Sequence, residues 1–267
     1  MGFWGDDYKP LPRSLSLQDF VERNHNSIFV VMDTETTGLS AQDADVIEVS
    51  AIKARFENGK VKVLDTFDEF INPGYPLPDK IVEFNEKNGT CICDEFLADK
   101  PVAGKVANAL QAFMEKEPKL EGSDKPYTLV GHNIEAFDVP FIQKLMKAGR
   151  GELQYGSTFD TLVYARSIIP YRGRGTHTLG VLHEKTPQRL FKEHPQYHNS
   201  LGDCLATLDL LETFAEKELA KYKEKEPEPA AAVPEPVREP AKTVRPVLRR
   251  VGASSVPPVK ETSERER

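Results

Sequence analysis

The sequence has few cysteines, no long hydrophobic run and more acidic than basic residues. Its 267 residues include only Cys91, Cys93 and Cys204, whose number and spacing predict neither a disulfide framework nor a zinc site. No apolar run is long enough to cross a membrane, and the first ten residues lack the basic and apolar regions of a secretory signal. We therefore expect a cytoplasmic protein without a membrane anchor.

The net charge of −7 excludes a protein that coats nucleic acid by charge alone. It leaves open an enzyme that grips a strand end through bound cations, because Mg²⁺ or Mn²⁺ inverts the local field of a carboxylate cluster. Hydrophobic residues make up 39% and charged residues 29%, a composition typical of a soluble globular domain.

Hydrophobic periodicity predicts a β-hairpin-led sheet followed by alternating helices and strands. The Asn58-Gly59 pair between two β-rich runs is a strong hairpin signal, and Gly149 closes one helical pattern. The expected strands are 28–32, 46–57, 60–71, 127–132 and 157–161, and the expected helices are 16–21, 101–117, 139–149, 162–168 and 201–225. This order implies a mixed α/β fold.

Composition divides the chain into a lead-in (1–26), a folded domain (27–225) and a tail (226–267). The tail is rich in Pro, Glu, Ala, Val and Arg and has no aromatic residue, so it is expected to be disordered. Residues 242–251 within it combine basic and aliphatic residues without an acid. A solvated linker is the favoured interpretation, and a short docking segment for a partner protein or nucleic acid is the alternative.

Asp33 and Glu35 end the first apolar strand, two residues apart, so both carboxylates leave the same face. Burying two such charges is costly unless a cation binds between them, and hard oxygen ligands favour Mg²⁺ or Mn²⁺. Alone, this pair is also found on ordinary solvated strands. The following residues 36–38, Thr-Thr-Gly, add hydrogen-bond donors and a backbone that can pass close to a ligand.

A second candidate, Asp138, follows an apolar strand and lies near the first turn of the next helix. It is a third metal carboxylate or an acid that stabilises a helix N-terminus. His132 and Asn133, at the end of the preceding strand, would line the same cleft.

His198 lies in a loop five residues before Asp203, which begins the last helix. A solvent-exposed loop histidine is the simpler interpretation, but a histidine beside a carboxylate is also the usual general base for activating water. His177, His183 and His194 have no acid at the same downstream spacing in a helix start.

These three segments, D-x-E-T-T-G, H-N-x-x-x-F-D and H-x-x-x-x-D in this order, resemble the DEDDh family of 3′→5′ exonucleases. The likeness is greatest to the epsilon-type proofreading subunits of bacterial replicative DNA polymerases, and it covers roughly residues 27–220. It implies an RNase H-like fold: a mixed five-stranded sheet flanked by helices and led by three antiparallel strands.

The resemblance also implies roles for individual residues. Asp33, Glu35, Asp138 and Asp203 would hold two Mg²⁺ or Mn²⁺ ions, and His198 would be the general base. The residues expected against the terminal nucleotide are Thr34, Thr36, Thr37, Gly38, Leu39 and Asn133. Ser200 and Cys204 stand where the family more often has alanine, and both are small enough to preserve activity.

Three functions remain in competition. A proofreading or repair exonuclease at single-stranded DNA 3′ ends is favoured, followed by an RNA-trimming exonuclease of the same family, since no side chain here identifies a sensor of the 2′-OH. A non-catalytic tethering module is disfavoured because all five catalytic-type residues are present. In the subunits that the chain resembles, a segment after the catalytic domain docks on the polymerase, and residues 242–251 are the candidate for that contact.

Overall fold

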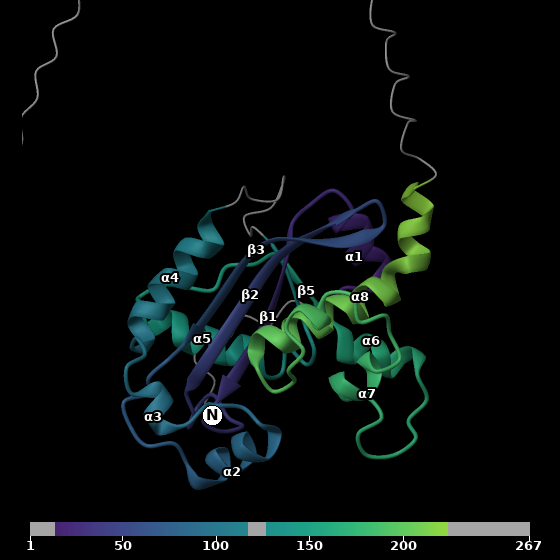
Figure 1. Ribbon diagram of the computed structural model, residues 1–267. Coiled ribbons are helices and arrows are strands. Elements are labelled where there is room, and N and C mark those ends of the chain that lie inside the picture. Colours follow the sequence, from purple (N-terminus) through teal and green to yellow (C-terminus); the bar gives the residue numbers. More distant parts are fainter. Residues whose placement is uncertain (1–13, 117–126, 224–267) are drawn as a thin grey trace, which may run out of the picture. The chain divides into compact units, whose positions relative to one another are not determined.

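Five strands form one mixed sheet in the order β3-β2-β1-β4-β5 (Figure 1). β1 pairs antiparallel with β2, and β2 with β3, whereas β4 and β5 continue the sheet in parallel with β1. The strands are β1 (Phe29–Thr36), β2 (Val46–Glu57), β3 (Lys60–Phe70), β4 (Thr128–Gly131) and β5 (Ser157–Asp160). This sheet confirms the predicted mixed five-stranded architecture.

The computed structural model describes residues 14–116 and 127–223. The predicted disordered tail (226–267) and its segment 242–251 lie outside the described residues. The domain boundaries expected after residues 26 and 225 stay predictions. Among the described helices, none is both long and apolar enough to span a membrane.

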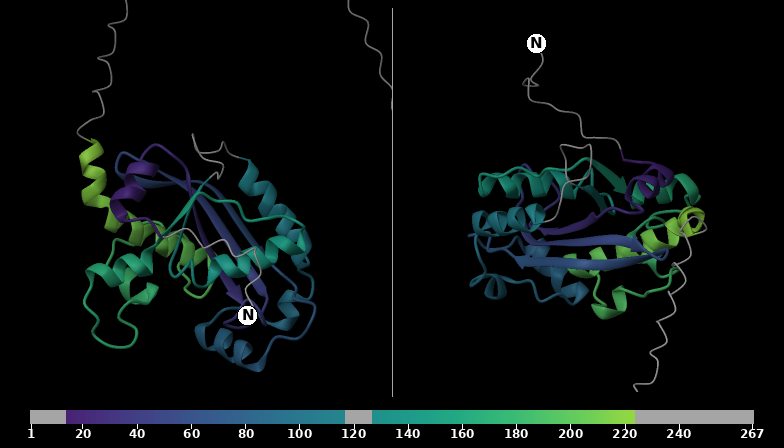
Figure 2. Two further views of the ribbon diagram at one scale, coloured as in Figure 1. Left: turned by 180° about the vertical axis from the view of Figure 1, so that it is seen from behind. Right: turned by 90° about the horizontal axis from the view of Figure 1, so that it is seen from above.

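Helices cover both faces of the sheet (Figure 2). α8 (Ser200–Lys223) and α1 (Leu17–Asn24) pack on one face, and α4 (Ala103–Glu115) and α5 (Asp138–Ala148) on the other. Side chains alternate along β1, so Phe29 and Val31 join the core under α8 and α1, while Val30 and Met32 join the core under α4 and α5. The strand is apolar on both sides because both sides are covered.

The periodicity predicts no element between residues 72 and 100, where the structure has α2 (Asp79–Asn88) and α3 (Asp94–Leu97). These helices share a small core of their own with the start of β2. Their apolar residues are few and pack only locally, so the signal of a core-facing helix is weak. The remaining helices are α6 (Thr161–Ile168), α7 (Leu179–His183) and the 3₁₀ turn η1 (Phe191–Glu193).

Two glycines show how a sequence signal relates to its structural cause. Asn58 and Gly59 have φ of 54° and 70°, so the predicted hairpin is confirmed with the left-handed backbone that this pair favours. Gly149 follows α5 as predicted, but its φ is −89°. A Cβ there would lie 2.8 Å from the Ala107 side chain, so this glycine permits the close approach of α4 to α5, and not a left-handed cap.

Candidate active site

Three carboxylates converge at the carboxyl end of β1. One oxygen from each of Asp33, Glu35 and Asp203 can be chosen so that all three atoms lie within 4.8 Å of one another. Asp33 and Glu35 are two apart on β1 and share the face that packs under α8. Asp203 lies in the first turn of α8. The spacing of the first motif and the start of the last helix therefore produce one cluster.

Asp138 lies beside this cluster without belonging to it. It is buried at the start of α5, and its Oδ1 accepts a 2.8 Å hydrogen bond from the hydroxyl of Thr34. Thr34 points to the α5 side of the sheet because it lies between Asp33 and Glu35 in the alternation. Thr34, expected against the nucleotide, thus has its hydroxyl engaged by Asp138.

Burial makes the four carboxyls weak acids, and mutual repulsion adds to this effect at Asp33 and Glu35. Burial, followed by the charge of Asp138 and then of Asp203, raises the pKa of Asp33 well above its ordinary value. Burial likewise raises the pKa of Glu35, and it brings the pKa of Asp138 and of Asp203 to about 7. Protonation of these carboxyls or binding of cations to them therefore stabilises the cluster.

The donor set fits hard divalent cations. Carboxylate oxygens are the ligands that Mg²⁺ and Mn²⁺ prefer, and Oδ1 of Asp203 is buried without a hydrogen-bond partner in the described part of the chain. A buried, unpaired carboxylate oxygen beside two other acids is costly unless a ligand satisfies it. Asp33, Glu35 and Asp203, with Asp138 next to them, are the residues that could hold such ions.

Glu48 is an acid of this region that the sequence analysis missed. It pairs with Glu35 across β1 and β2 and is completely buried. Its carboxylate accepts hydrogen bonds from Asn199 Nδ2 (2.5 Å) and from the Ser200 backbone N–H (3.2 Å). Burial, with the nearby charge of Asp68, raises its pKa to about 8. The signal for Glu48 in the sequence was a single acid inside the mostly apolar run 46–52.

His198 is held next to the cluster in a left-handed backbone conformation. Its φ is 58°, its N–H donates to Asp203 Oδ2 at 3.3 Å, and its ring meets the edge of Phe84 with centroids 5.0 Å apart. Partial burial lowers its pKa below the ordinary value. The ring is therefore neutral at physiological pH, which is the state that can accept a proton.

The loop that carries His198 is fixed by contacts on both sides. Tyr197 bonds through its hydroxyl to Nδ1 of buried His183 at 2.7 Å, and Nε2 of His183 faces Asp209 at 3.3 Å. At Gly202 an added Cβ would lie 1.9 Å from the Gln196 carbonyl oxygen. Only glycine lets the loop pass this close to the first turn of α8.

The other histidines considered from the sequence have structural partners. His183 is buried in the network just described, His177 Nε2 bonds to the Ile169 carbonyl at 2.9 Å, and His194 Nε2 lies 3.0 Å from the Asn199 side chain. His132, expected to line the cleft, bonds through Nδ1 to Thr161 and through Nε2 to the His177 carbonyl.

The residues after Glu35 form a tight loop with one protruding side chain. Thr36 Oγ1 donates to the Gly38 carbonyl at 2.6 Å, and Thr37 Oγ1 accepts the Asp45 N–H at 2.9 Å. A Cβ at Gly38 would lie 3.1 Å from Ala44, so the glycine allows close packing within the loop. Leu39 is 91% exposed and is free to contact a ligand.

Asn133 also has a left-handed backbone, with a φ of 76°. Its N–H donates to Asp160 Oδ1 at 3.0 Å, so the end of β4 is tied to the end of β5. Its half-buried side chain lies at the same end of the sheet as Asp33, beyond the carboxyl end of β4.

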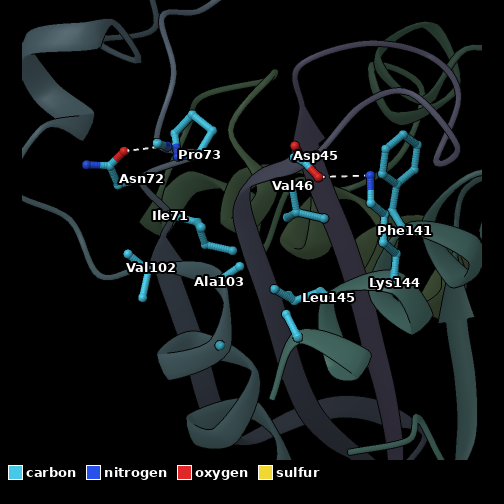
Figure 3. Close-up of a pocket in the computed structure, with 13 residues that line it drawn as sticks. Asp45, Val46, Ile71, Asn72, Pro73, Val102, Ala103, Phe141, Lys144 and Leu145 are labelled. Atoms are coloured by element: carbon cyan, nitrogen blue, oxygen red, sulfur yellow. Dashed lines mark hydrogen bonds and ion pairs between the residues drawn. The ribbon is translucent and has the colours of Figure 1, made fainter. Parts of the chain in front are cut away.

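A separate pocket of about 310 Å³ lies between the ends of β2 and β3 and the helices α4 and α5 (Figure 3). Its lining is mostly apolar, with Ile71 and Leu145 among its side chains, and the Asp45–Lys144 ion pair (2.9 Å) at one side. None of the clustered carboxylates lines it. The acidic cluster and this pocket are therefore distinct features.

The raised pKa values predict an unusual dependence of stability on pH. A carboxyl whose pKa rises from 3.8 to about 7, as for Asp203, binds its proton more tightly in the folded state. That stability is present at low pH and is lost as pH rises through about 7. The Tm of the metal-free chain should therefore fall by about 5 °C or more between pH 5 and pH 8.

Mg²⁺ should restore this loss at pH 8 and have little effect at pH 5, where protons occupy the carboxyls. Asp203→Asn, which removes one of the charges, should flatten the pH dependence. Thermal unfolding of both chains with EDTA and with Mg²⁺ measures these effects. A wild-type Tm at pH 8 that is insensitive to Mg²⁺ would contradict the assignment of a cation site.

A family profile described as exonuclease, RNase_T, matches residues 30–211, well over half of the 267-residue chain. The chain belongs to this exonuclease family. It is therefore an exonuclease-family hydrolase, and the predicted membership of the DEDDh group is confirmed.

Relatives in this family include large polymerases. The chain is 34% identical over 183 residues to the DNA polymerase III PolC-type of Bacillus cereus, which covers 68% of this chain and 11% of that protein. It is also 34% identical over 191 residues to the same protein of Streptococcus agalactiae, covering 71% and 11%. The chain thus spans about a tenth of the length of these relatives.

Solved structures support the fold. Exonuclease I of E. coli in complex with a dT13 oligonucleotide superposes with a TM-score of 0.53 at 14% identity, covering 74% of this chain and 43% of that one. A second structure of exonuclease I gives 0.51 at 16% identity, covering 75% and 45%. At such identities the likeness concerns the arrangement of strands and helices.

Proposed function

We propose that the chain is a metal-dependent 3′→5′ exonuclease that releases nucleoside 5′-monophosphates from single-stranded DNA ends, in proofreading or repair. The observation that carries the proposal is the group of three partly buried carboxylates, Asp33, Glu35 and Asp203, with His198 held next to it by the bond from its N–H to Asp203. The PolC-type polymerases among its relatives support a role on DNA, as does the solved complex of exonuclease I with an oligonucleotide.

Asp33, Glu35 and Asp203, together with Asp138, would hold two Mg²⁺ or Mn²⁺ ions. Bound there, the ions would neutralise phosphate charge, lower the pKa of the attacking water and stabilise the leaving 3′-oxygen. The carboxylates must be ionised to bind cations, so each cation displaces protons that burial otherwise favours.

His198 accepts the proton of the attacking water through its neutral ring. Its partial exposure lets the ring reach a substrate, while the bond from its N–H to Asp203 keeps it next to the carboxylates. Thr36, Leu39 and Asn133 would contact the terminal nucleotide in this proposal, and the exposure of Leu39 supports a contact between its side chain and a base.

The test compares matched DNA and RNA oligonucleotides, labelled at the 5′ end, with Mg²⁺ and with EDTA. We expect stepwise shortening of DNA from the 3′ end, slower shortening of RNA and no product in EDTA. Faster hydrolysis of RNA would favour the RNA-trimming function, and absence of hydrolysis on either polymer with Mg²⁺ would favour a tethering module. Hydrolysis that survives EDTA would contradict both nuclease proposals.

Association with a polymerase is a further part of this proposal. PolC-type relatives combine a matching segment with a much longer polymerase chain, and residues 242–251 offer basic and aliphatic side chains for such a contact. A chain lacking residues 226–267 should keep its hydrolysis in the same assay, and it should lose binding to a purified polymerase subunit.

The unpaired thiols of Cys91, Cys93 and Cys204 suit a reducing compartment, and we propose the cytoplasm.

A further inference from the structure

The loop between α6 and α7 differs in charge from the rest of this acidic chain. Asp and Glu make up 42 of the 267 residues, yet none occurs between Asp160 and Glu184. The same stretch contains Arg166, Arg172 and Arg174. A basic segment in an acidic protein is a candidate for contact with a polyanion.

The α6–α7 loop (residues 170–178) has a defined shape. The Arg172 N–H donates to Thr176 Oγ1 at 3.1 Å, and this hydroxyl donates to the Gly173 carbonyl at 2.7 Å. Gly173 and Gly175 have φ of 118° and 89°, which other residues rarely adopt. These turns hold the loop without using its charged side chains.

Three side chains of the loop face solvent. Tyr171 is 72% exposed, with its ring stacked near that of His177, and Arg172 and Arg174 are both exposed. Neither guanidinium forms an ion pair with an acid in residues 14–116 or 127–223. An exposed aromatic ring together with exposed basic side chains is the combination that binds single-stranded nucleic acid, through base stacking and phosphate contacts.

His132 anchors this loop at the end of the sheet where the carboxylates lie, next to the carboxyl end of β1. Its Nε2 donates to the His177 carbonyl at 2.8 Å, and it directly follows β4. Val31 pairs with Val130 in the register of β1 and β4, so His132 is level with Asp33. The loop thus borders the end of the sheet that carries the candidate active site (Figure 1).

We propose that the α6–α7 loop binds the single strand on the 5′ side of the nucleotide being removed, with Tyr171 stacking on a base and Arg172 and Arg174 contacting phosphates. The acidic cluster can hold the terminal phosphate only through cations, and it repels the rest of the strand. Basic side chains of a loop anchored at the same end of the sheet supply the attraction that the cluster lacks. This inference rests on the proposed nuclease function.

The test uses the Arg172→Ala/Arg174→Ala variant of the full-length chain. For a long oligo-dT substrate, KM should rise about tenfold or more with kcat nearly unchanged, and for a dinucleotide substrate both should match the parent. Loss of two phosphate contacts should also reduce the slope of log KM against log salt by about 1.4. Tyr171→Ala should raise KM about 5- to 100-fold, and Tyr171→Phe should restore it.

Lys105→Gln/Lys147→Gln is the charge-matched control, because it removes two exposed charges from α4 and α5 on the other side of the molecule. It should leave KM unchanged. Equal effects of the two double variants would show that only net charge matters and would overturn the proposal. An unchanged KM in the arginine variant would overturn the proposal as well. This holds even if the arginine variant lost binding to a protein partner.

A second measurement separates this inference from the nuclease function. Binding of a fluorescent oligo-dT can be followed by anisotropy in EDTA, where no turnover occurs. The arginine variant should bind at least about tenfold more weakly than the lysine control. If the chain binds in this way but hydrolyses nothing with Mg²⁺, the nuclease proposal fails and the strand-binding surface remains supported. If it hydrolyses DNA but both variants bind equally, only the surface is rejected.

Discussion

Replacing Asp33 with asparagine should lower kcat for exonuclease activity by at least about 10³-fold and, at the same time, stabilise the metal-free protein. The amide has the shape of the carboxylate but lacks its charge, so a cation loses a central ligand and with it several kcal/mol of transition-state stabilisation. In the absence of cations the charge of Asp33 is unfavourable, because its carboxylate is buried and is repelled by the charges of Asp138 and Asp203. Loss of activity with a gain in stability is typical of a functional site.

Steady-state assays with Mg²⁺ and thermal unfolding in EDTA at pH 8 measure the two effects on the same samples. Glu152→Gln is a matched control, since Glu152 is an exposed carboxylate outside the cluster, and it should change neither quantity. If Asp33→Asn digested DNA like the parent, the catalytic assignment would be wrong. A dead and destabilised Asp33→Asn would indicate that Asp33 supports the fold and not a cation.

The parts of the fold that could be predicted are those encoded by local patterns. The apolar run before Asp33 identifies a central strand, and Asn58-Gly59 identifies the hairpin because both residues tolerate positive φ. The two-residue spacing of Asp33 and Glu35 places them on one face. Each of these predictions needs only neighbours in the sequence.

Features that depend on residues far apart in the sequence could not be predicted from local patterns. Glu48 resembles an interruption of an apolar strand, and its partners Asn199 and Ser200 lie 151 and 152 residues away. Thr34 adjoins Asp33, yet its hydroxyl bonds to Asp138, 104 residues away. The same motif therefore contributes to two sides of the sheet, and which member of it can face a nucleotide depends on the helices that cover each side.

The loop before α8 shows the same limit for the candidate base. The five-residue spacing to Asp203 singled out His198, but it did not reveal that Tyr197 links the loop to His183 and Asp209 inside the domain. Nor did it reveal that Gly202 is required for the loop to lie against α8. The position of His198 is thus specified by residues that carry no catalytic signature of their own.

His198→Ala should reduce kcat by about 10²- to 10⁴-fold, the usual effect of losing a general base, with KM nearly unchanged. A base must be unprotonated to act, so kcat of the parent should rise with pH and level off near a pKa below the ordinary 6.5 of histidine, because burial lowers it. The variant should lose this plateau and increase with pH across the neutral range, since hydroxide must then come from solvent. A variant that keeps both the rate and the plateau would rule out His198 as the base.

Tyr197→Phe separates a positioning role from a general loss of structure. It removes the hydroxyl that bonds to His183 but keeps the ring, which stacks on Phe191 with centroids 4.5 Å apart. Loss of one hydrogen bond should lower kcat by about 2- to 10-fold. Because Tyr197 would act only through His198, the same substitution should have no effect on kcat in the His198→Ala background. Additive losses in the double variant would instead mean that the network from Asp209 to Tyr197 stabilises the domain without positioning the base.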